Sequence, residues 1–520
     1  MKKTLGDFQT PPYLVKLILQ RLDISGQNYS RVLEPACGRG NFIQGLLGLE
    51  KPPQEIQGIE LQSSYINELE HIKNCCSTTR IQIHHQQLFN FDLKRDLQWQ
   101  TAGKLLVIGN PPWINIAQLS RENSNNVPQK SNLKNLKGLE AITGSSNFDL
   151  TEYIWLKILQ ELASEEITIA LLCKLSVARK VLEFASDRQL PVIAASLWKI
   201  DAKKSFGVSV GAGLFKLCLG QGKVQYNVPV YRSLEATKPY TEMGIVNQRV
   251  VSNINSYYKF AFADGECPLI WRQGVKHDAA SVMELNYNED GSLYNKVGEL
   301  VTVEADYIYP LYKSTQLFKQ KEVTTEKAVI LTQQFLGEDT LKLKQIAPQL
   351  WRYLTQHKTI FDNRKSSIYR NQPLFAIFGI GEYTFSAYKV AISGLHKNPR
   401  FRALGLVNNR PIVLDDTCYF IPCDSPEQAA FLTCLLNHPL SLELIQSWLF
   451  PDAKRPITKK LLKRLDFTAL LTQINWRSLL PYAEIEFANI ASSDQQPNWP
   501  SDPSLFWQKP AKYRQLYLSL

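Results

Sequence analysis

The chain has 520 residues, 44% of them hydrophobic and 21% charged, and its 59 Lys and Arg outnumber its 48 Asp and Glu for a net charge of +11. The length predicts more than one domain, the composition is typical of globular proteins, and the positive charge favours a polyanionic partner. Because no apolar run reaches membrane-spanning length and MKKTLGDFQTPP has no apolar core, we expect no membrane contact, no signal peptide and a cytoplasmic protein with reduced cysteines.

Short apolar runs alternate with helical stretches over roughly the first 220 residues. This pattern predicts a mainly parallel sheet with helices on both faces and an active site beyond the carboxyl ends of the strands. After about residue 225 the alternation stops, so we predict a first domain over 1–230 and a second, α+β domain over 231–520. The predicted strands are 31–35, 55–61, 104–110, 166–173 and 191–198, and the predicted helices are 12–22 and 151–163.

The stretch RVLEPACGRGNF at 31–42 has the pattern of a strand, a glycine turn and the start of a helix. Gly38 and Gly40 allow positive φ and close approach of a ligand to the backbone, and Glu34 can accept a hydrogen bond from a ligand cation. The dinucleotide pattern GxGxxG is not met, because Ile43 stands at the third glycine position. The next strand ends in Glu60, which is placed to bind the two hydroxyls of a ribose. A purely structural turn and a solvated strand end are the alternatives.

The predicted strand at 104–110 ends in Asn110-Pro111-Pro112-Trp113. Two prolines fix φ and remove backbone donors, which makes the turn rigid. The side-chain oxygen of Asn110 and the carbonyl of Pro111 can together accept both hydrogens of a planar amino group, and Trp113 offers a flat face for the ring that carries it. The turn therefore predicts a site for an –NH2 on an aromatic ring or an amide; a strand-ending turn with a core tryptophan is the alternative.

Together these motifs resemble the gamma-type N6-adenine DNA methyltransferases of restriction–modification systems, which use S-adenosylmethionine. TPP (10–12), LEPACGRGNF (33–42), IEL (59–61) and NPPW (110–113) are similar to their cofactor and catalytic motifs in the same order. The resemblance covers roughly residues 4–220. It implies cofactor contacts from Thr10, Glu34, Pro35, Ala36, Gly38, Gly40, Glu60, Leu61, Gln87, Leu88 and Asn110, and catalytic roles for Asn110, Pro111, Pro112, Trp113 and Phe206.

Three further positions follow from the resemblance. The family has an acidic acceptor for the cofactor's adenine after its third strand, and the matching position here is Gln87, with Asp92 as the second choice. SNFDLTEYIW (146–155) resembles the next motif, with Asp149 before a helix. KSFGVSVGAGLFKL (204–217) resembles the motif whose aromatic residue contacts the target base, which indicates Phe206.

The implied fold is a Rossmann-like class I methyltransferase domain followed by a large α+β target-recognition domain. The implied activity is methylation of the N6 amino group of an adenine flipped out of duplex DNA, with Trp113 and Phe206 on either side of the base. No metal and no covalent nucleophile are required. Cytosine C5 chemistry is rejected because Pro422-Cys423 lies far outside the catalytic region. We expect a monomer and a separate cognate restriction endonuclease.

Several alternatives remain open from the residues alone. The polar segment 114–146 is a functional loop or a solvated insertion. The basic runs 453–464 and 364–370 bind phosphates or form solvated helix faces. An N4-cytosine DNA methyltransferase, an RNA or protein amino-group methyltransferase, and a non-enzymatic DNA-binding module all remain alternatives for the function.

Overall fold

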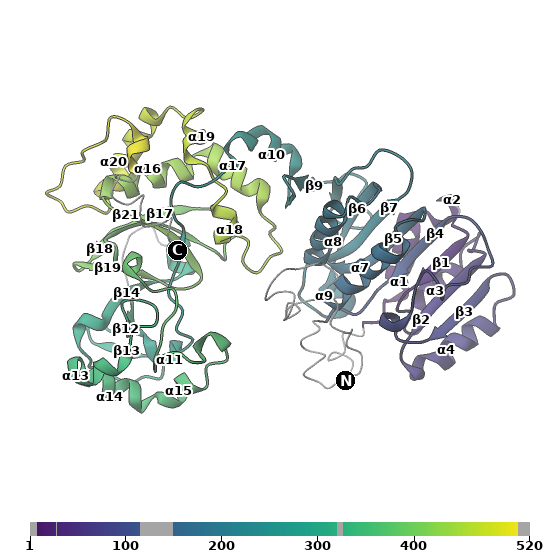
Figure 1. The fold of residues 1–520 in the computed structure, drawn as a ribbon, viewed down its shortest axis with the longest axis horizontal. Helices are drawn as coiled ribbons and strands as arrows, with labels where there is room; N and C mark the ends of the chain where they lie inside the picture. Colours follow the sequence, from purple (N-terminus) through teal and green to yellow (C-terminus); the bar gives the residue numbers. More distant parts are fainter. Residues whose placement is uncertain (1–7, 28, 115–148, 320–325, 508–520) are drawn as a thin grey trace. The chain divides into compact units, whose positions relative to one another are not determined.

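The computed structural model describes residues 8–27, 29–114, 149–319 and 326–507 (Figure 1). The chain divides into two compact units, Met1–Asn255 and Ser256–Leu520. Within the described ranges, no helix has both the length and the apolar character needed to cross a membrane. The predicted polar loop at 114–146 lies outside the described residues apart from Ile114.

The first unit is built on a ten-stranded sheet with the order β10-β9-β8-β6-β7-β5-β4-β1-β2-β3. Strands β1 to β5 are parallel, whereas β7 runs antiparallel to β5 and β6 on either side of it. The strands are β1 Arg31–Glu34, β2 Glu55–Glu60, β3 Arg80–His85, β4 Leu105–Gly109, β5 Ile167–Lys174, β6 Val192–Ile200, β7 Ala212–Leu219, β8 Val228–Tyr231, β9 Thr241–Val246 and β10 Arg249–Val251.

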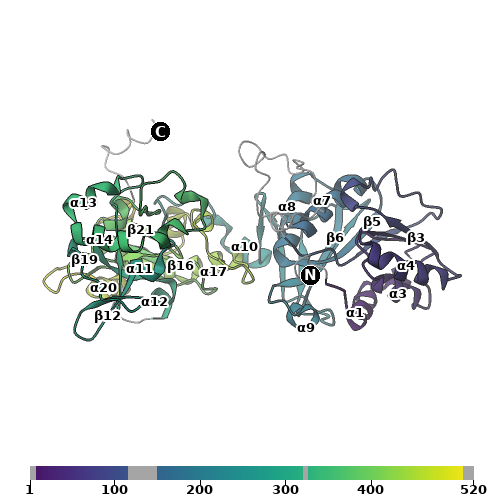
Figure 2. The same cartoon turned by 90° about the horizontal axis from the view of Figure 1, so that it is seen from below.

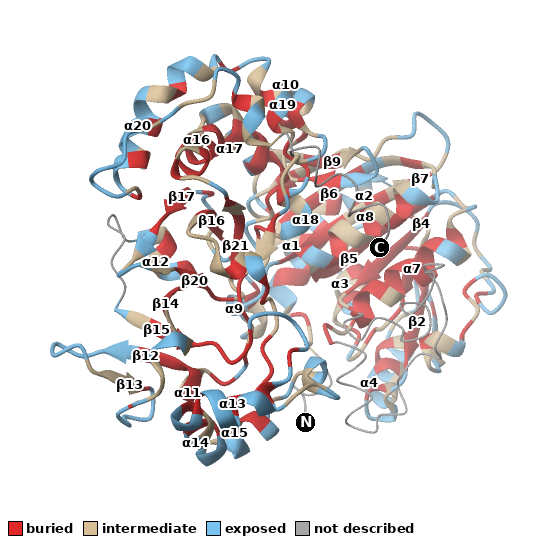
Figure 3. Cartoon of the chain, turned by 60° about the vertical axis from the view of Figure 1, so that its left-hand side comes forward, coloured by how far each residue is buried: buried red, intermediate tan, exposed pale blue. Residues whose placement is uncertain are grey.

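Helices cover both faces of this sheet, which explains why its central strands are continuous apolar runs. Every residue of β4 is buried (Figure 3). Leu106 and Ile108 share a hydrophobic cluster with the helices on one face, and on the other face Trp155 packs against Phe215 with ring centroids 5.3 Å apart. The helices of this unit are α1 Pro12–Leu22, α2 Ile24–Gln27, α3 Asn41–Leu47, α4 Ser63–Asn74, α7 Leu150–Leu162, α8 Leu175–Asp187 and α9 Ala202–Phe206, and helix α10 Ile254–Phe260 begins at the end of this unit and continues into the second.

The strand order confirms the predicted Rossmann-like α/β fold with a mixed, mainly parallel sheet. Neighbouring strands β1 and β4 lie where the order of the chain reverses, and ligands of such sheets bind beyond the carboxyl ends of the strands at this point. Each predicted strand and helix is present. Strands β3, β7, β8, β9 and β10 are missing from the prediction, and β3 is an edge strand of alternating burial rather than an apolar run.

The second unit is α+β, as predicted. Its strands form sheets in the orders β11-β21-β16-β17, β13-β12-β15-β14-β20 and β18-β19. The strands are β11 Arg272–Gln273, β12 Glu284–Tyr287, β13 Leu293–Asn295, β14 Ile308–Tyr312, β15 Lys327–Ile330, β16 Tyr388–Ser393, β17 Phe401–Leu404, β18 Leu406–Val407, β19 Arg410–Pro411, β20 Val413–Leu414 and β21 Cys418–Cys423. The helices are α11 Ala280–Met283, α12 Ser314–Lys319, α13 Leu343–Ile346, α14 Pro348–Gln356, α15 Lys358–Asp362, α16 Pro426–Asn437, α17 Pro439–Trp448, α18 Lys459–Leu462, α19 Phe467–Leu471 and α20 Leu480–Ala488.

The two units divide later in the chain than the sequence predicts. The predicted boundary lies between residues 230 and 231, whereas the compact units meet at Asn255 and Ser256. Strand β8 pairs with β6, and β9 and β10 extend the same sheet. These three strands have no helices between them, so the strand–helix alternation ends before the sheet does.

Candidate active site

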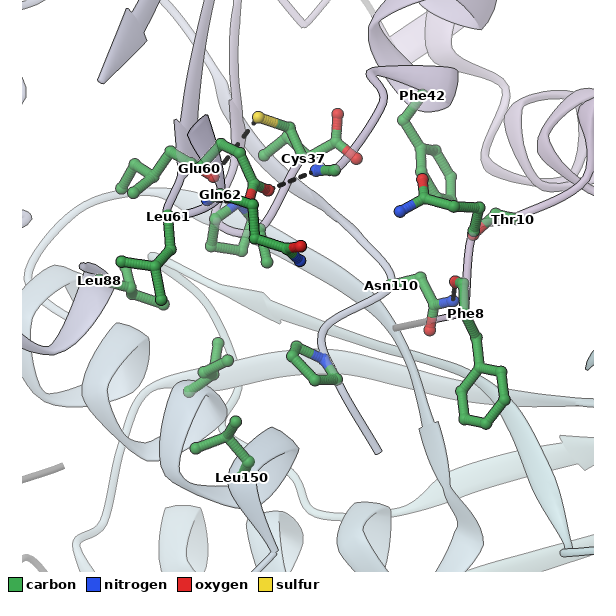
Figure 4. A pocket seen from close by; sticks show the side chains of 18 of the residues that line it. Phe8, Thr10, Cys37, Phe42, Glu60, Leu61, Gln62, Leu88, Asn110 and Leu150 are labelled. Carbon is green, nitrogen blue, oxygen red and sulfur yellow. Dashed lines mark hydrogen bonds between the residues drawn. The ribbon is translucent and has the colours of Figure 1, made fainter. Parts of the chain in front are cut away.

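A cavity of about 230 Å³ lies beyond the carboxyl ends of β1, β2 and β4. Figure 4 shows Glu60, Leu61 and Leu88 along one side of it and Thr10, Phe8 and Asn110 along the other. Nine of the eleven residues expected to contact a cofactor line this cavity; they are Thr10, Glu34, Pro35, Ala36, Gly38, Glu60, Leu61, Leu88 and Asn110.

The glycine turn after β1 needs its glycines. Gly38 and Gly40 have φ of +51° and +79°, a region that favours glycine. A Cβ on Gly40 would lie 2.8 Å from Leu69 Cδ2, so this position also has no space for a side chain. Gly40 does not line the cavity but lets α3 pack closely against α4, whereas Gly38 forms part of the cavity wall.

Glu60 at the end of β2 closes the same turn. Its Oε2 accepts from the backbone N–H of Gly38 at 2.7 Å, and its Oε1 accepts from the backbone N–H of Gln62 at 2.7 Å. The residue is buried. These charge-assisted bonds hold the carboxylate at the cavity wall.

Glu34 is the most buried acidic group of the cavity, with 2% of its surface exposed. Its Oε2 is buried without a hydrogen-bond partner among the described residues. Burial raises the pKa of the Glu34 carboxyl well above its usual range, and the nearby Glu60 carboxylate raises it further. A buried acceptor without a hydrogen bond costs free energy of folding, and a ligand that donates to it, best a cation, removes this cost.

The segment before α1 crosses these strand ends. The carbonyl of Thr10 accepts from Asn41 Nδ2 at 2.8 Å, and Gln9 Oε1 accepts from the backbone N–H of Arg39 at 3.2 Å. These bonds fasten the segment to the glycine turn and the start of α3. Thr10 is therefore part of the cavity, although it is far from Glu34 in the sequence.

Asn110, directly after β4, is held in one orientation. Its Nδ2 donates to the carbonyl of Phe8 at 2.8 Å, which identifies the other side-chain atom as the oxygen. This Oδ1 is buried and has no hydrogen-bond partner among the described residues. The side chain therefore presents an oriented acceptor without a donor, in the wall of the cavity.

The two prolines carry the turn away from β4 as the sequence predicts. Pro112 lines the cavity, and its carbonyl accepts from Thr151 Oγ1 of α7 at 2.7 Å. Pro111 is buried. Asp149 caps α7 by accepting from the backbone N–H of Thr151 at 3.0 Å, and it forms an ion pair with Lys174 at 2.6 Å. Its carboxylate is thus engaged in holding α7 against the end of β5.

Trp113 and Phe206, the two rings expected on either side of a target base, contact each other directly. Their rings meet edge to face, with centroids 5.1 Å apart and an interplanar angle of 74°. A base between two parallel rings needs a spacing of about 7 Å, twice the contact distance of stacked atoms. Trp113 is a buried member of the core, whereas Phe206 is partly exposed, and Phe8 contacts both rings.

Gln87 and Asp92, the two expected acceptors for the cofactor's adenine, both lie outside the cavity lining. Gln87 Oε1 accepts from Asn90 Nδ2 at 3.0 Å, and Asp92 accepts from the backbone and side chain of Arg95. Gln86 lines the cavity instead. The cavity lining thus includes the residue directly before the predicted Gln87.

Further residues of the cavity are not among those predicted from the sequence. Phe8 and Gln9 directly precede the identified Thr10, but only the fold brings them to Asn110. The residues that line the cavity without having been predicted are Phe8, Gln9, Cys37, Asn41, Phe42, Ile59, Gln62, Gln86, Phe89, Leu150 and Ile154. Across the described part of the chain, no group of three or more His, Cys, Asp or Glu side chains is arranged to hold a metal ion.

Comparisons with known proteins extend over both units of the chain. The chain is 35% identical over 470 residues to the type II methyltransferase M.NspV of Nostoc sp. This alignment covers 90% of this chain and 97% of that protein. No protein-family model matches. Among solved structures, the type IIL restriction–modification enzyme MmeI in complex with DNA has 11% identity and a TM-score of 0.49, covering 91% of this chain and 75% of that one. The type IIG restriction endonuclease BpuSI has 14% identity and a TM-score of 0.35, covering 92% and 60%.

Proposed function

Because the chain belongs to the type II methyltransferases of restriction–modification systems, which use S-adenosylmethionine, we propose that it methylates the N6 amino group of an adenine flipped out of duplex DNA. The observation that carries this proposal is the oriented, unpartnered Oδ1 of Asn110 in the wall of the cavity. An exocyclic –NH2 supplies the donor that this acceptor lacks.

The residues of the cavity fit the cofactor. The Glu34 carboxylate, whose Oε2 has no partner within the described chain, would hold the ammonium group, and Glu60 would accept from the ribose hydroxyls. Gln86, in place of the predicted Gln87, would accept from the adenine amino group. When bound, S-adenosylmethionine supplies a methyl group on a sulfonium centre.

The chain's own contribution to the reaction is acceptance and positioning. The N6 lone pair of adenine is delocalised into the ring and is a poor nucleophile. Asn110 Oδ1 and the Pro111 carbonyl would each accept one N6 hydrogen, which favours a more tetrahedral nitrogen and aims its lone pair. Phe8 is a positioning residue. Its carbonyl accepts from Asn110 Nδ2, so the Asn110 oxygen points away from Phe8.

Base flipping is required because the target atom cannot be reached inside a duplex. We assign the stacking surface to Phe206, whose ring is partly exposed, with Trp113 buried behind it in edge-to-face contact. Trp113 thus supports the ring that receives the base.

The first test of this proposal is the identity of the product. The protein, incubated with labelled cofactor and plasmid DNA, is expected to yield N6-methyladenine after enzymatic digestion and mass spectrometry. Recovery of N4-methylcytosine instead would show that the turn at Asn110 binds the amino group of cytosine. Labelling of RNA or protein in place of DNA would overturn the proposal.

Cofactor binding is expected to depend on pH through Glu34. In the free protein, the raised pKa of Glu34 keeps its carboxyl protonated at pH values where a carboxyl is ordinarily ionised. The ammonium group of the cofactor, in contrast, pairs with the ionised carboxylate. Affinity should therefore rise as pH rises through the raised pKa, with release of a proton. Calorimetry in buffers of different ionisation enthalpy measures that proton.

The Glu34→Gln variant is the control for this dependence, because it has no carboxyl to titrate. It should bind more weakly and release no proton in this range. Equal proton release by both proteins would assign the titration to another group.

We propose that the second unit recognises the DNA target and that a monomer performs the modification, with a separate chain as restriction endonuclease.

The basic run at 453–464 is only partly available to bind phosphates. Arg464 forms a bidentate ion pair with Asp264, at 3.0 and 2.6 Å, and Arg455 pairs with Asp416 at 2.9 Å. Lys459, Lys460 and Lys463 are exposed.

The exposed lysines of this run are expected to contribute a sequence-independent part of DNA affinity. Lys459→Ala combined with Lys460→Ala should lower the slope of log affinity against log salt by about two, because two phosphates would no longer be neutralised by lysine. Fluorescence anisotropy over a salt series measures this slope. An unchanged slope would show that these lysines are only a solvated helix face.

A further inference from the structure

We propose that the first unit carries its own phosphate-binding surface, formed by Lys199 and Arg232 around Tyr240, which holds the DNA strand beside the flipped base. This inference rests on the proposed function and names a contact surface outside the second unit. Lys199 lies near the end of β6, Arg232 directly follows β8, and Tyr240 directly precedes β9.

The two cations are brought to one aromatic ring. Lys199 Nζ lies 4.7 Å and Arg232 Cζ 4.8 Å from the centroid of the Tyr240 ring. Strands β6 and β8 are parallel with Trp198 opposite Tyr231, so Lys199 and Arg232 are the next residues along each strand. The rings of Trp198 and Tyr231, one residue earlier in the chain, are stacked 5.4 Å apart at 17°.

Among the described residues, no carboxylate oxygen lies within 4.0 Å of a side-chain nitrogen of Lys199 or Arg232. The face of Tyr240 attracts both charges but neutralises neither. Two like charges held together at a surface attract an anion, and a guanidinium beside an ammonium suits the oxygens of a phosphodiester. Tyr240 is itself 39% exposed, so the surface is open to a ligand.

The position of this surface identifies its partner. Strands β6 and β8 run in the same direction as β4 and therefore end at the same edge of the sheet as Asn110. Helix α9 follows β6 and carries Phe206, the ring in contact with Trp113. Figure 2 shows α9 near α1 at this edge, where Tyr13 Oη lies 3.0 Å from Ser205 Oγ.

Helix α9 adds two more cations next to Phe206. Lys203 and Lys204 are exposed, and Lys204 donates its backbone N–H to Asp201 at 2.9 Å, which caps the helix. A base stacked on Phe206 has its own phosphates within a few bond lengths of its ring. The strand that carries this base must therefore pass the α9 lysines, and Lys199 and Arg232 continue the positive rim along β6 and β8.

The test compares two double variants of the full chain. Lys199→Gln with Arg232→Gln removes the charges and keeps most of each stem. Lys104→Gln with Lys223→Gln removes two exposed cations from loops that lead into β4 and β8, at the opposite edge of the same sheet. Both are assayed by anisotropy with a duplex that the wild type methylates, over a salt series, and by steady-state methylation.

The first variant is expected to lower the slope of log affinity against log salt by about two and to raise KM for DNA rather than to lower kcat, with cofactor affinity unchanged. The control should match the wild type. Equal slopes and KM for both variants would overturn the inference, as would a loss confined to kcat. Absence of DNA methylation by the wild type itself would instead overturn the proposed function.

Discussion

Asn110→Ala should reduce the rate of methyl transfer by roughly a hundredfold to a thousandfold, the usual effect of removing one oriented hydrogen-bonding group from a reaction centre. The side-chain oxygen is buried and without a partner in the described chain, and the bond from Nδ2 to Phe8 fixes its direction. The loss should appear in single-turnover rates on DNA that contains the recognised site. Cofactor affinity should change little, because Glu34 and Glu60 lie on other strands.

Two variants control this result. Asn110→Asp keeps an acceptor but replaces the donor to the Phe8 carbonyl by a second oxygen, so we expect a rate between those of the wild type and the Ala variant. Asn90→Ala removes an exposed amide that contacts Gln87 and should be neutral. A near-normal rate for folded Asn110→Ala would mean that the turn after β4 is structural.

Glu60→Ala is expected to weaken cofactor binding by roughly tenfold to a hundredfold. Hydrogen bonds to a charged group contribute about 1.5–3 kcal/mol, and each 1.4 kcal/mol changes affinity by about tenfold. Glu60 also holds the backbone amides of Gly38 and Gln62, each at 2.7 Å, so its removal loosens the glycine turn as well as the ribose contact. Calorimetry with the cofactor measures the loss.

Glu60→Gln separates these two contributions. It keeps an acceptor for one backbone amide but replaces the other oxygen with a donor, and it loses the charge. Glu68→Ala is the matched control, since this exposed carboxylate on α4 pairs with Arg39 at 3.7 Å outside the cavity lining. Wild-type affinity in Glu60→Ala would remove this residue from the cofactor site.

The structure also changes what is expected of Trp113. Its ring is buried and meets Phe206 edge to face, so a substitution there acts on the position of Phe206 and on the core together. Phe206, with its ring partly exposed, is the more direct site at which to test stacking of the base.

The sequence by itself determined the five apolar strands β1, β2, β4, β5 and β6 of the first sheet, the glycine turn and the turn at Asn110. These features depend on neighbouring residues: apolar runs define buried strands, glycine permits positive φ, and proline fixes φ and removes a donor. Glu34 and Glu60, the predicted cofactor contacts, both line the cavity because the ends of parallel strands meet at one edge.

Only the tertiary structure decided which side chains face the cavity and which charges are already paired. Gln86 rather than Gln87 lines the cavity, and Arg464 is bound by Asp264, a residue distant in the sequence. Phe8 orients Asn110 across a similarly long separation. A local pattern carries no information on such partners, because side-chain direction and ion pairing are set by packing between segments that the fold alone brings together.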